Sequence, residues 1–572
     1  MYTQMASLQR VRVKGHTYWR IVESRRVRGK PRAIPVLHLG TADALLERLL
    51  QAPEGRLRIK SARHGDVAAL KSAADRLGVV GVIDRHVPRR ARAQSVGTTL
   101  LLAALNRAVR PRSKRGWAAW ARRTSLAHLF PGLDIDAMTS QFFWDQMHRV
   151  PLSALRKIEE ELTQRIVSQL DAPLDTLFYD TTNFFTYIDS TNARCTVARR
   201  GHSKQKRFDL RLFGLALLVS REDQIPLLSH VYEGNEVDSC LFPLALTRIR
   251  ERLEALAVEV KDITLVYDKG NNSRANQAQV DAAPFGYVAS LVPTQHKELL
   301  ATPRTSYAAS GKGPMGGVPV LRLRRTIWGR ERTVLLFWSE QLHAGQVRGL
   351  EQHLSKRLRE LAAWKERLCH PRSGPRTPAA ARKQVAAILS GQYINRVLHV
   401  EYDAEREGSD RLRYEVDAEA LAHLESEVFG KRILITDRHD WSDEQILLAY
   451  RGQSRVEGAF RQLKDDEHMA IRPQYHWTDQ KIHVHAFICL LGFLLGRLVE
   501  RDARRLGYRE GLSGLLELLG GVRLAMVLTP SAKRGGRPRC TWQLESGEPD
   551  AAGLLCRLVP NHAPFVYTDG VT

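Results

Sequence analysis

Two aspartates in the middle of the chain each follow a run of apolar residues, and together they could bind a metal ion. Asp180 ends the segment LDTLFYD, and Asp268 follows ITLVY. Both segments are typical of buried β-strands. Carboxylates at the ends of neighbouring strands can share hard cations, and ligands that are all oxygen favour Mg²⁺ or Mn²⁺. A single aspartate after a strand is also a common loop-starting or helix-capping residue, so neither position carries this chemistry alone.

A third carboxylate, Glu457, lies in the helical segment AYRGQSRVEGAFRQLK. Tyr450, Glu457 and Lys464 are seven residues apart, so they form a stripe on one helix beside an apolar face. That apolar face consists of Ala449, Val456, Phe460 and Leu463. A carboxylate at the edge of the core, with a phenol and an amine nearby, suits metal binding next to a phosphate. The alternative is a solvated Glu457 that pairs with Arg461 one turn away.

The elements around these residues form a mixed α/β pattern. The strand before Asp180 is followed by DLRLFGLALLVS and IPLLSHVYEG, which flank a turn at residues 221–224 and predict a hairpin. Three adjacent antiparallel strands result. An amphipathic helix over residues 239–258, the strand before Asp268 and the strand GYVASLV then imply a crossover.

The whole chain divides into six predicted regions. They are a β-ribbon at 1–57, a helical and DNA-binding region at 58–170, the first part of the core at 171–292, a strand-rich insertion at 293–430, the second part of the core at 431–504 and a helical C-terminal region at 505–572. Ser442 is the expected N-cap of the helix that carries Glu457. The basic segment 110–123 either contacts DNA or is a solvated helix face with Trp117 and Trp120 in the core.

The charge balance predicts a polyanionic partner. Lys and Arg number 87 against 62 Asp and Glu, which leaves a net charge of +25. A basic ribosome-like surface protein or a membrane-surface binder would not need an apolar content of 43%, so nucleic acid is favoured. A dense basic cluster follows the first candidate strand, and it either positions DNA or is an exposed loop. Its members are Arg199, Arg200, Lys204, Lys206 and Arg207.

Several features predict a cytoplasmic protein without a membrane segment. The six cysteines form no CxxC pair, which favours reduced thiols. The N-terminal residues contain no apolar stretch typical of a signal peptide. The longest strongly apolar run, residues 486–496, is shorter than the roughly 20 residues that span a bilayer, so a buried core helix is expected. The histidines at 468, 476, 483 and 485 do not have the spacing of a metal site.

Four segments together resemble bacterial insertion-sequence transposases of the DDE class, in the branch whose last helix carries Tyr-x2-Arg-x3-Glu-x6-Lys. They are FYDTTNFF from Phe178, LVYDKGNNS from Leu265, the Tyr450 to Lys464 helix and IRPQYHWTDQKIHVHAFICLLGFLL. The match covers residues 174–500, and the order of the segments is more specific than any one of them. The resemblance implies an RNase H-like core with an insertion before the last catalytic helix.

The same resemblance implies a cut-and-paste mechanism. Asp180, Asp268 and Glu457 would be both the catalytic residues and the ligands of two Mg²⁺ ions, with Mn²⁺ able to substitute. The substrates would be double-stranded DNA at terminal inverted repeats and at the target, bound by a homodimer. Tyr450 and Lys464 would contact phosphates near the cut, and a hairpin intermediate would form at the DNA end.

One position departs from the motif: Gln453 stands where the family has arginine. Glutamine keeps hydrogen bonding at this DNA-contacting position and loses the charge, and Arg461 is the predicted partial replacement. Gly536-Arg537-Pro538 is similar to a minor-groove hook, although a solvated turn is the better interpretation. Two other functions remain open on the sequence alone. They are an RNase H-like structure-specific nuclease and a non-catalytic DNA-binding regulator derived from a transposase.

Overall fold

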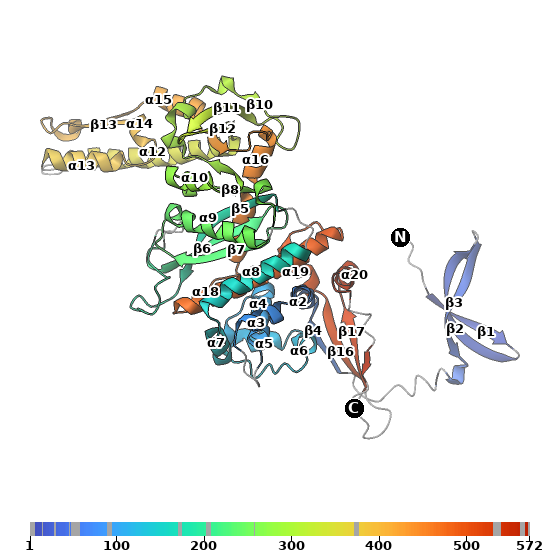
Figure 1. The fold of residues 1–572 in the computed structure, drawn as a ribbon. Helices are drawn as coiled ribbons and strands as arrows, with labels where there is room; N and C mark the ends of the chain where they lie inside the picture. The colour runs from blue at the N-terminus through green and yellow to red at the C-terminus, as the bar shows by residue number, and fades with distance from the viewer. Residues whose placement is uncertain are drawn as a thin grey trace. The chain divides into compact units, whose positions relative to one another are not determined.

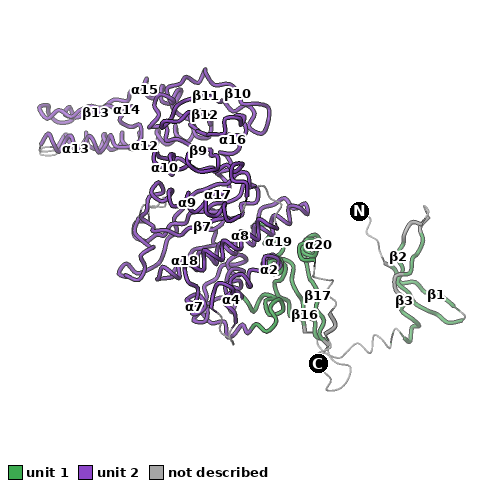
Figure 2. The backbone as a smooth tube through the Cα atoms, viewed as in Figure 1, with its two compact units in different colours: residues 1–69, 121–133, 514–572 green, residues 70–120, 134–513 purple. Residues whose placement is uncertain are grey.

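The protein forms two compact units in the computed structural model (Figure 2). Unit 1 comprises Met1–Ala69, Ala121–Leu133 and Gly514–Thr572, and unit 2 comprises Leu70–Trp120 and Asp134–Ser513. The structure describes residues 6–13, 15–27, 30–44, 46, 58–88, 94–169, 174–201, 207–256, 258–370, 377–529, 539–560 and 567–569.

Unit 1 contains two antiparallel sheets among its described residues. The first comprises β1 (Ala6–Val13), β2 (His16–Val27) and β3 (Lys30–Gly40), which confirms the predicted N-terminal ribbon. The second has the order β18 (Tyr567–Asp569), β17 (Arg539–Glu545), β16 (Arg523–Thr529) and β4 (Arg58–Arg63). The prediction of a helical C-terminal region was therefore wrong in part, although α19 (Leu512–Gly520) and α20 (Pro549–Leu558) are helices. β16 pairs with β4 from the opposite end of the chain, and such pairing leaves no local signal.

Unit 2 is built on a nine-stranded mixed sheet (Figure 1). Its spatial order is β10 (Ala308–Ala309), β11 (Pro319–Ile327), β12 (Arg330–Trp338), β15 (Lys431–Thr436), β9 (Gly286–Ser290), β8 (Thr264–Tyr267), β5 (Thr176–Thr186), β6 (Arg211–Ser220) and β7 (Pro226–Glu233). β5, β6 and β7 pair antiparallel, whereas β8 lies parallel to β5 and β9 lies parallel to β8. The hairpin and the crossover predicted from the sequence are confirmed, with α9 (Asp238–Ala255) before β8 and α10 (Arg274–Val280) after it.

β5 extends beyond the residue at which it was predicted to end. The strand continues through Asp180 to Thr186, whereas its parallel neighbour β8 stops at Tyr267. The second half of β5 has a partner of its own because β6 pairs with it all the way from Leu177 to Thr186. Asp180 therefore lies within a strand, at the level where β8 ends.

The predicted insertion extends the sheet and also forms a separate layer. β11 and β12 correspond to the two predicted strands, and β12 pairs with β15. The remainder is more helical than expected, with α12 (Glu340–Leu368), α13 (Pro378–Ile388), α14 (Ile394–Val397), α15 (Ala418–His423) and the hairpin β13 (Leu398–Tyr402) and β14 (Leu412–Val416). This layer has its own core, in which Leu361, Ile394 and Phe429 are fully buried.

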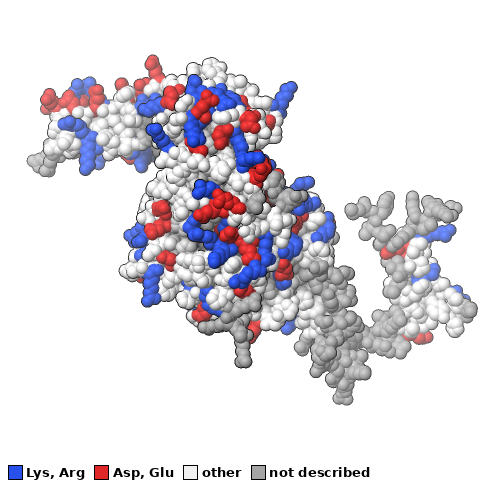
Figure 3. Space-filling view, in the orientation of Figure 1, with Lys and Arg blue, Asp and Glu red and all other residues white. Residues whose placement is uncertain are grey.

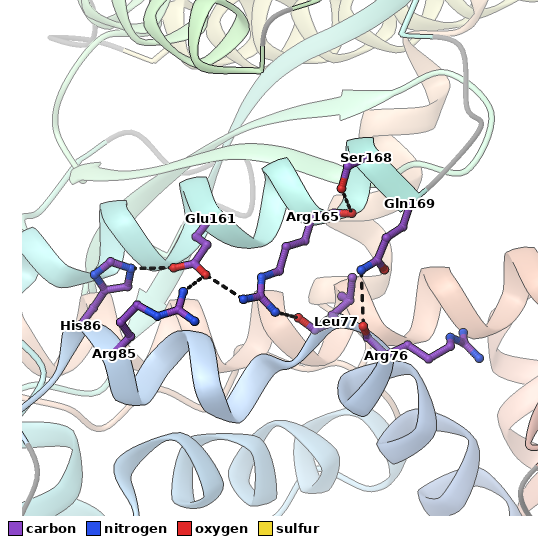
Figure 4. A network of polar contacts seen from close by, with 8 residues as sticks. All are labelled: Arg76, Leu77, Arg85, His86, Glu161, Arg165, Ser168 and Gln169. Atoms are coloured by element: carbon purple, nitrogen blue, oxygen red, sulfur yellow. Dashed lines mark hydrogen bonds and ion pairs between the residues drawn. The ribbon is translucent and has the colours of Figure 1, made fainter.

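A polar network joins helix α8 (Leu152–Gln169) to the helices that precede it, α2 (Gly65–Leu77) and α3 (Val79–His86) (Figure 4). The carboxylate of Glu161 accepts hydrogen bonds from Arg85, His86 and Arg165. Burial raises the pKa of Glu161, but these hydrogen bonds outweigh it and the net pKa is lowered. Arg165 also donates to the Leu77 carbonyl at 2.9 Å, at the end of α2. The network thus ties α8 to α3 and to the end of α2 within unit 2.

Helix α18 (Asp479–Arg505) is the core helix of unit 2. Among the described helices it is the one whose length and composition would suffice to cross a membrane, yet 89% of its apolar window is buried inside the protein. It packs against α4 (Val96–Val109), α7 (Ser140–His148) and α8. Charged side chains also lie within this packing, because Arg497 pairs with Glu500 at 2.6 Å and Arg501 pairs with Asp223 at 3.1 Å. The prediction of a buried core helix is confirmed.

The segment that carries Glu457 is two helices rather than the single predicted one. α16 (Asp443–Arg451) begins at Ser442 with a capping box, as predicted for its N-cap. It ends at Gly452, and α17 (Ser454–Leu463) follows. A Cβ atom at Gly452 would lie 2.1 Å from Cζ of Phe178 on β5. The break between α16 and α17 therefore lies where the chain contacts Phe178, and Tyr450 does not share a helix with Glu457 and Lys464.

This close approach predicts the effect of a single methyl group. Gly452→Ala should lower the free energy of unfolding by about 1–3 kcal/mol, because the ring of Phe178 must shift to make room. Urea denaturation followed by circular dichroism measures the change. Gly345→Ala in α12 is the matched control, since nothing lies within 4 Å of its added Cβ, and it should stabilise the helix by about 0.5–1 kcal/mol. Equal stability of the two variants would contradict the close approach.

Candidate active site on the parallel strands

Asp180, Asp268 and Ser290 lie in one row across three adjacent parallel strands. In the registers of these pairs, Tyr179 lies opposite Tyr267, and Tyr267 lies opposite Ala289. The next residue on each strand is therefore at the same level. Because neighbouring strands are about 4.8 Å apart, the row brings the backbones of the two aspartates close together. Asp268 thus lies just after the end of β8, at the level of Asp180 inside β5.

The two aspartates face the helices α16 and α17. Successive side chains of a strand point to opposite faces of a sheet. Tyr179 and Tyr267 pack against Phe242 of α9, with ring centroids 5.4 Å and 4.8 Å apart. Asp180 and Asp268, one residue further along, therefore point to the other face. Phe178 lies on that face as well, beneath Gly452.

Glu457 lies on the part of α17 that covers Asp180. At the start of the helix, Nε2 of Gln453 donates to the carbonyl of Tyr179 at 3.1 Å. At its end, Nζ of Lys464 donates to Oγ1 of Thr182 at 2.6 Å and lies 5.4 Å from the Phe184 ring. These two anchors bracket Asp180 along β5. Glu457 is exposed and lies within about 40° of both anchoring residues around the helix, so it projects over the same stretch of strand.

Asp268 belongs to a connected group of polar side chains. The hydroxyl of Ser290 donates to its Oδ1 at 2.6 Å and accepts from the Lys269 N–H at 2.9 Å. The phenol oxygen of Tyr450 accepts a hydrogen bond from Arg432 at 2.7 Å. Burial raises the pKa of Tyr450, Arg432 opposes this and Asp268 adds to it. The phenol thus stays protonated beside the carboxylate.

The chemistry of the donors fits a hard cation held by few protein ligands. Asp180 and Asp268 offer only oxygen, and both are half-buried at the level where β8 ends. Mg²⁺ is commonly bound by one or two carboxylates, with waters and substrate phosphates completing its shell. Among the described residues, no group of three or more His, Cys, Asp and Glu side chains lies close enough together to hold a metal. The aspartate pair is therefore the part of the predicted set that the fold itself brings together.

Two predicted DNA contacts differ in their surroundings. Gln453 is only 7% exposed, and its amide donates to the carbonyl of Tyr179 on β5. Its predicted DNA contact stays a prediction, with little of the side chain open to solvent. Arg461 is exposed, and within the described residues it forms no ion pair with Glu457. The alternative in which Glu457 pairs with Arg461 therefore loses its basis.

The basic cluster after β5 is partly matched by acidic residues. Arg199 lies 3.5 Å from Glu233, and Arg207 forms two hydrogen bonds to Asp209. Arg200 donates to the Ser190 hydroxyl at 3.2 Å. Figure 3 likewise shows basic and acidic side chains interspersed on the face it draws. Lys204, Lys206 and the Gly536-Arg537-Pro538 segment lie outside the described residues.

Two of the four histidines noted in the sequence pack against each other in the buried core of unit 2. His476 and His485 are buried, with ring centroids 4.9 Å apart. Nε2 of His476 accepts from Lys114 at 3.0 Å, and Nε2 of His485 lies 2.9 Å from the Ile471 carbonyl. In the basic segment 110–123, Trp117 and Trp120 are buried, so these tryptophans belong to the core.

Sequence reasoning missed three polar neighbours of the site. Ser290 ends an apolar strand as Asp268 does, so the same signal could have found it. Thr182 follows two residues after Asp180, and period-two alternation alone would have placed both on one face. Arg432 carries no such signal, because only the pairing of β15 with its neighbours brings it beneath Tyr450.

The chain was compared with protein families, curated proteins and solved structures. No family model matches the sequence, and no curated protein matches it. Among solved structures, the chain is similar to the cryo-EM structure of the piggyBac transposase synaptic complex with hairpin DNA. The sequences are 8% identical, the TM-score is 0.40, and the match covers 80% of this chain and 79% of that chain. A likeness of this size does not carry a functional argument, so the residues of this chain must.

The buried histidine pair predicts a loss of stability in acid. Burial, with Arg107 and Lys114 nearby, lowers the pKa of both His476 and His485 well below 6.5. Below about pH 6.5 the two histidines are protonated in the unfolded chain but stay neutral in the folded protein. The free energy of unfolding should then decrease as pH falls, by up to about 1.4 kcal/mol per pH unit for each histidine. Urea denaturation between pH 7.5 and 5 measures this slope. His485→Gln should make it shallower, and parallel curves for variant and wild type would contradict the prediction.

Proposed function

We propose that this protein is a DNA transposase that cuts DNA at transposon ends and joins the freed 3′ ends to target DNA. Asp180, Asp268 and Glu457 are its catalytic carboxylates. The observation that carries the proposal is the register of the parallel strands. It sets Asp180 and Asp268 side by side on the face that α17 covers with Glu457.

The topology supports an RNase H-like catalytic core. The strands β7, β6, β5, β8 and β9 are spatial neighbours, with the first three antiparallel and the last two parallel to β5. The DDE transposases that the sequence resembles have three antiparallel strands first and an insertion before the last catalytic helix. In this chain the insertion lies between β9 and α16, which matches that layout.

The three carboxylates would hold two Mg²⁺ ions, with Mn²⁺ as a substitute. Bound there, the ions would activate the attacking water or 3′-hydroxyl and stabilise the leaving oxygen of an in-line displacement. Ser290 orients Asp268 by its hydrogen bond to Oδ1. The hydrogen bond from Lys464 to Thr182 keeps an ammonium group beside β5, where it can neutralise a DNA phosphate.

Double-stranded DNA is the proposed substrate, at terminal inverted repeats and at the target site. The net charge of +25 supports a polyanionic partner and predicts binding that weakens with salt. A homodimer in the cytoplasm that brings two DNA ends together completes the proposal. Helix α18 is mostly buried inside the protein and contains the ion pair between Arg497 and Glu500. Both features are typical of a core helix rather than of a membrane-spanning helix.

Substitution of the carboxylates tests this function. The protein is incubated with Mg²⁺ and duplexes drawn from the DNA that flanks its coding region. Asp180→Ala, Asp268→Ala and Glu457→Ala should each slow strand cleavage by about a thousandfold or more. Each substitution removes a proposed ligand of the Mg²⁺ ions that would stabilise the charge of the transition state. DNA binding should persist. Glu467→Ala, an exposed carboxylate just beyond α17, is the control and should cleave at the wild-type rate.

The products separate the proposal from its rivals. Cleaved ends joined to target DNA identify a transposase, whereas cleavage without joining identifies a structure-specific nuclease. Specific binding by the wild type with no cleavage in Mg²⁺ or Mn²⁺ would instead identify a regulator. Retained cleavage in the Asp180 or Asp268 variant would refute the active site itself.

A further inference from the structure

We propose that the cavity beside Asp268 binds a backbone phosphate of the DNA next to the cut, and that Arg432 provides the guanidinium group for it. Arg432 thus takes the role that the family motif gives to an arginine at position 453. This inference rests on the proposed function, and it names a binding residue on β15 that lies outside the motif.

The cavity has a volume of about 170 Å³ and lies against the candidate active site. Its lining includes Lys269, Ser290, Arg432 and Tyr450. Lys269 directly follows Asp268, and Ser290 holds the carboxylate of Asp268 at 2.6 Å. A group bound in the cavity would therefore lie one side chain away from the proposed metal ligand.

Two cations of this cavity lack an acidic partner. Among the described residues, neither Arg432 nor Lys269 forms an ion pair with a carboxylate. Lys431, the adjacent cation, is different because it pairs with Glu427 at 3.9 Å and donates to the carbonyls of Leu300 and Thr302. Arg432 and the exposed Lys269 thus contribute positive charge to the cavity, which favours an anion.

The hydrogen-bonding groups match a phosphodiester. Arg432 uses one N–H to donate to the Tyr450 oxygen, and its planar guanidinium carries further donors. The guanidinium carbon lies 5.7 Å from the Tyr450 ring centroid, so the phenol holds it in place. Tyr450 also lines the cavity, where its hydroxyl contacts Arg432 and Ser290. Arginine and a neutral hydroxyl together recognise phosphate by charge-assisted hydrogen bonds.

The bend at Gly452 explains why the guanidinium comes from a strand. Position 453 is buried against the carbonyl of Tyr179, where a charged side chain would be costly. Glutamine satisfies that carbonyl and cannot reach the cavity. Arg432 lies below Tyr450 instead, on the strand that returns the chain from the insertion to α16.

Binding measurements test the inference without requiring cleavage. A duplex carrying the transposon end is titrated in EDTA with wild type, Arg432→Gln and the control Arg451→Gln, which removes an exposed cation beside Tyr450. Arg432→Gln should weaken binding about ten- to a hundredfold and reduce the slope of log K against log salt by about 0.9. Arg451→Gln should change affinity about twofold or less. Wild-type affinity in Arg432→Gln would overturn the inference.

A neutral phosphate locates the contact. Methylphosphonate is placed at each backbone position around the cut, one per duplex. At one position it should weaken wild-type binding about tenfold or more and have no further effect on Arg432→Gln, because the partner is already lost. The effect of each methylphosphonate is the ratio of the affinities of one protein for the modified and the unmodified duplex. A lowered fraction of folded protein in a variant affects both affinities equally and cancels from this ratio. The inference would be overturned if, at every position, the methylphosphonate weakened binding by the same factor in wild type and in Arg432→Gln. It would also be overturned if the methylphosphonate effect disappeared in Arg461→Gln rather than in Arg432→Gln.

The two proposals fail in different ways. Coupling between Arg432 and one phosphate, with no cleavage by the wild type in Mg²⁺ or Mn²⁺, supports the phosphate site and refutes the transposase. Cleavage and joining without such coupling supports the transposase and refutes the role of Arg432.

Discussion

The parallel pairing of β5, β8 and β9 is the constraint on which the candidate site depends. A shift of one residue in either pair would send an aspartate to the α9 face, because side chains alternate along a strand. Tyr179 and Tyr267 oppose such a shift, since both rings are fully buried around Phe242. Large aromatic side chains on one face of the sheet therefore hold small carboxylates in position on the other.

The helical side of the site depends on one close approach. Gly452 lets the chain pass over Phe178, and this contact divides the segment into α16 and α17. Tyr450 at the end of α16 contacts Arg432 near Asp268, whereas Gln453 and Lys464 tie the two ends of α17 to β5 on either side of Asp180. Position 453 is buried against the Tyr179 carbonyl, where an amide is less costly than a charged group.

The insertion supports the site as well as interrupting the core. Its strands β11 and β12 extend the main sheet, and β12 pairs with β15. β15 in turn pairs with β9, the strand that ends at Ser290. Arg432 thus reaches Tyr450 because the insertion has built the strand pairings that hold β15 beside the site. The helices of the insertion have a core of their own, and Leu342 and Gln346 of α12 also line the cavity beside the site.

The sequence by itself determined the features that local periodicity encodes. Apolar runs identified the strands before Asp180 and Asp268, and turn residues identified the hairpin of β6 and β7. The 3.6-residue period identified the buried face of Val456, Phe460 and Leu463. These patterns are local because each strand or helix buries one face of its own. They were enough to single out three candidate carboxylates and to predict a mixed α/β core.

Only the tertiary structure decided how those elements meet. The break between α16 and α17 lies against the Phe178 ring of β5, and the sequence of the helices does not predict this contact. Arg432 becomes a neighbour of Tyr450 through strand pairing across the insertion, and β4 pairs with β16 from the far end of the chain. Such contacts join residues that are distant in sequence. They do not produce a local periodic pattern, so they cannot be predicted from sequence periodicity.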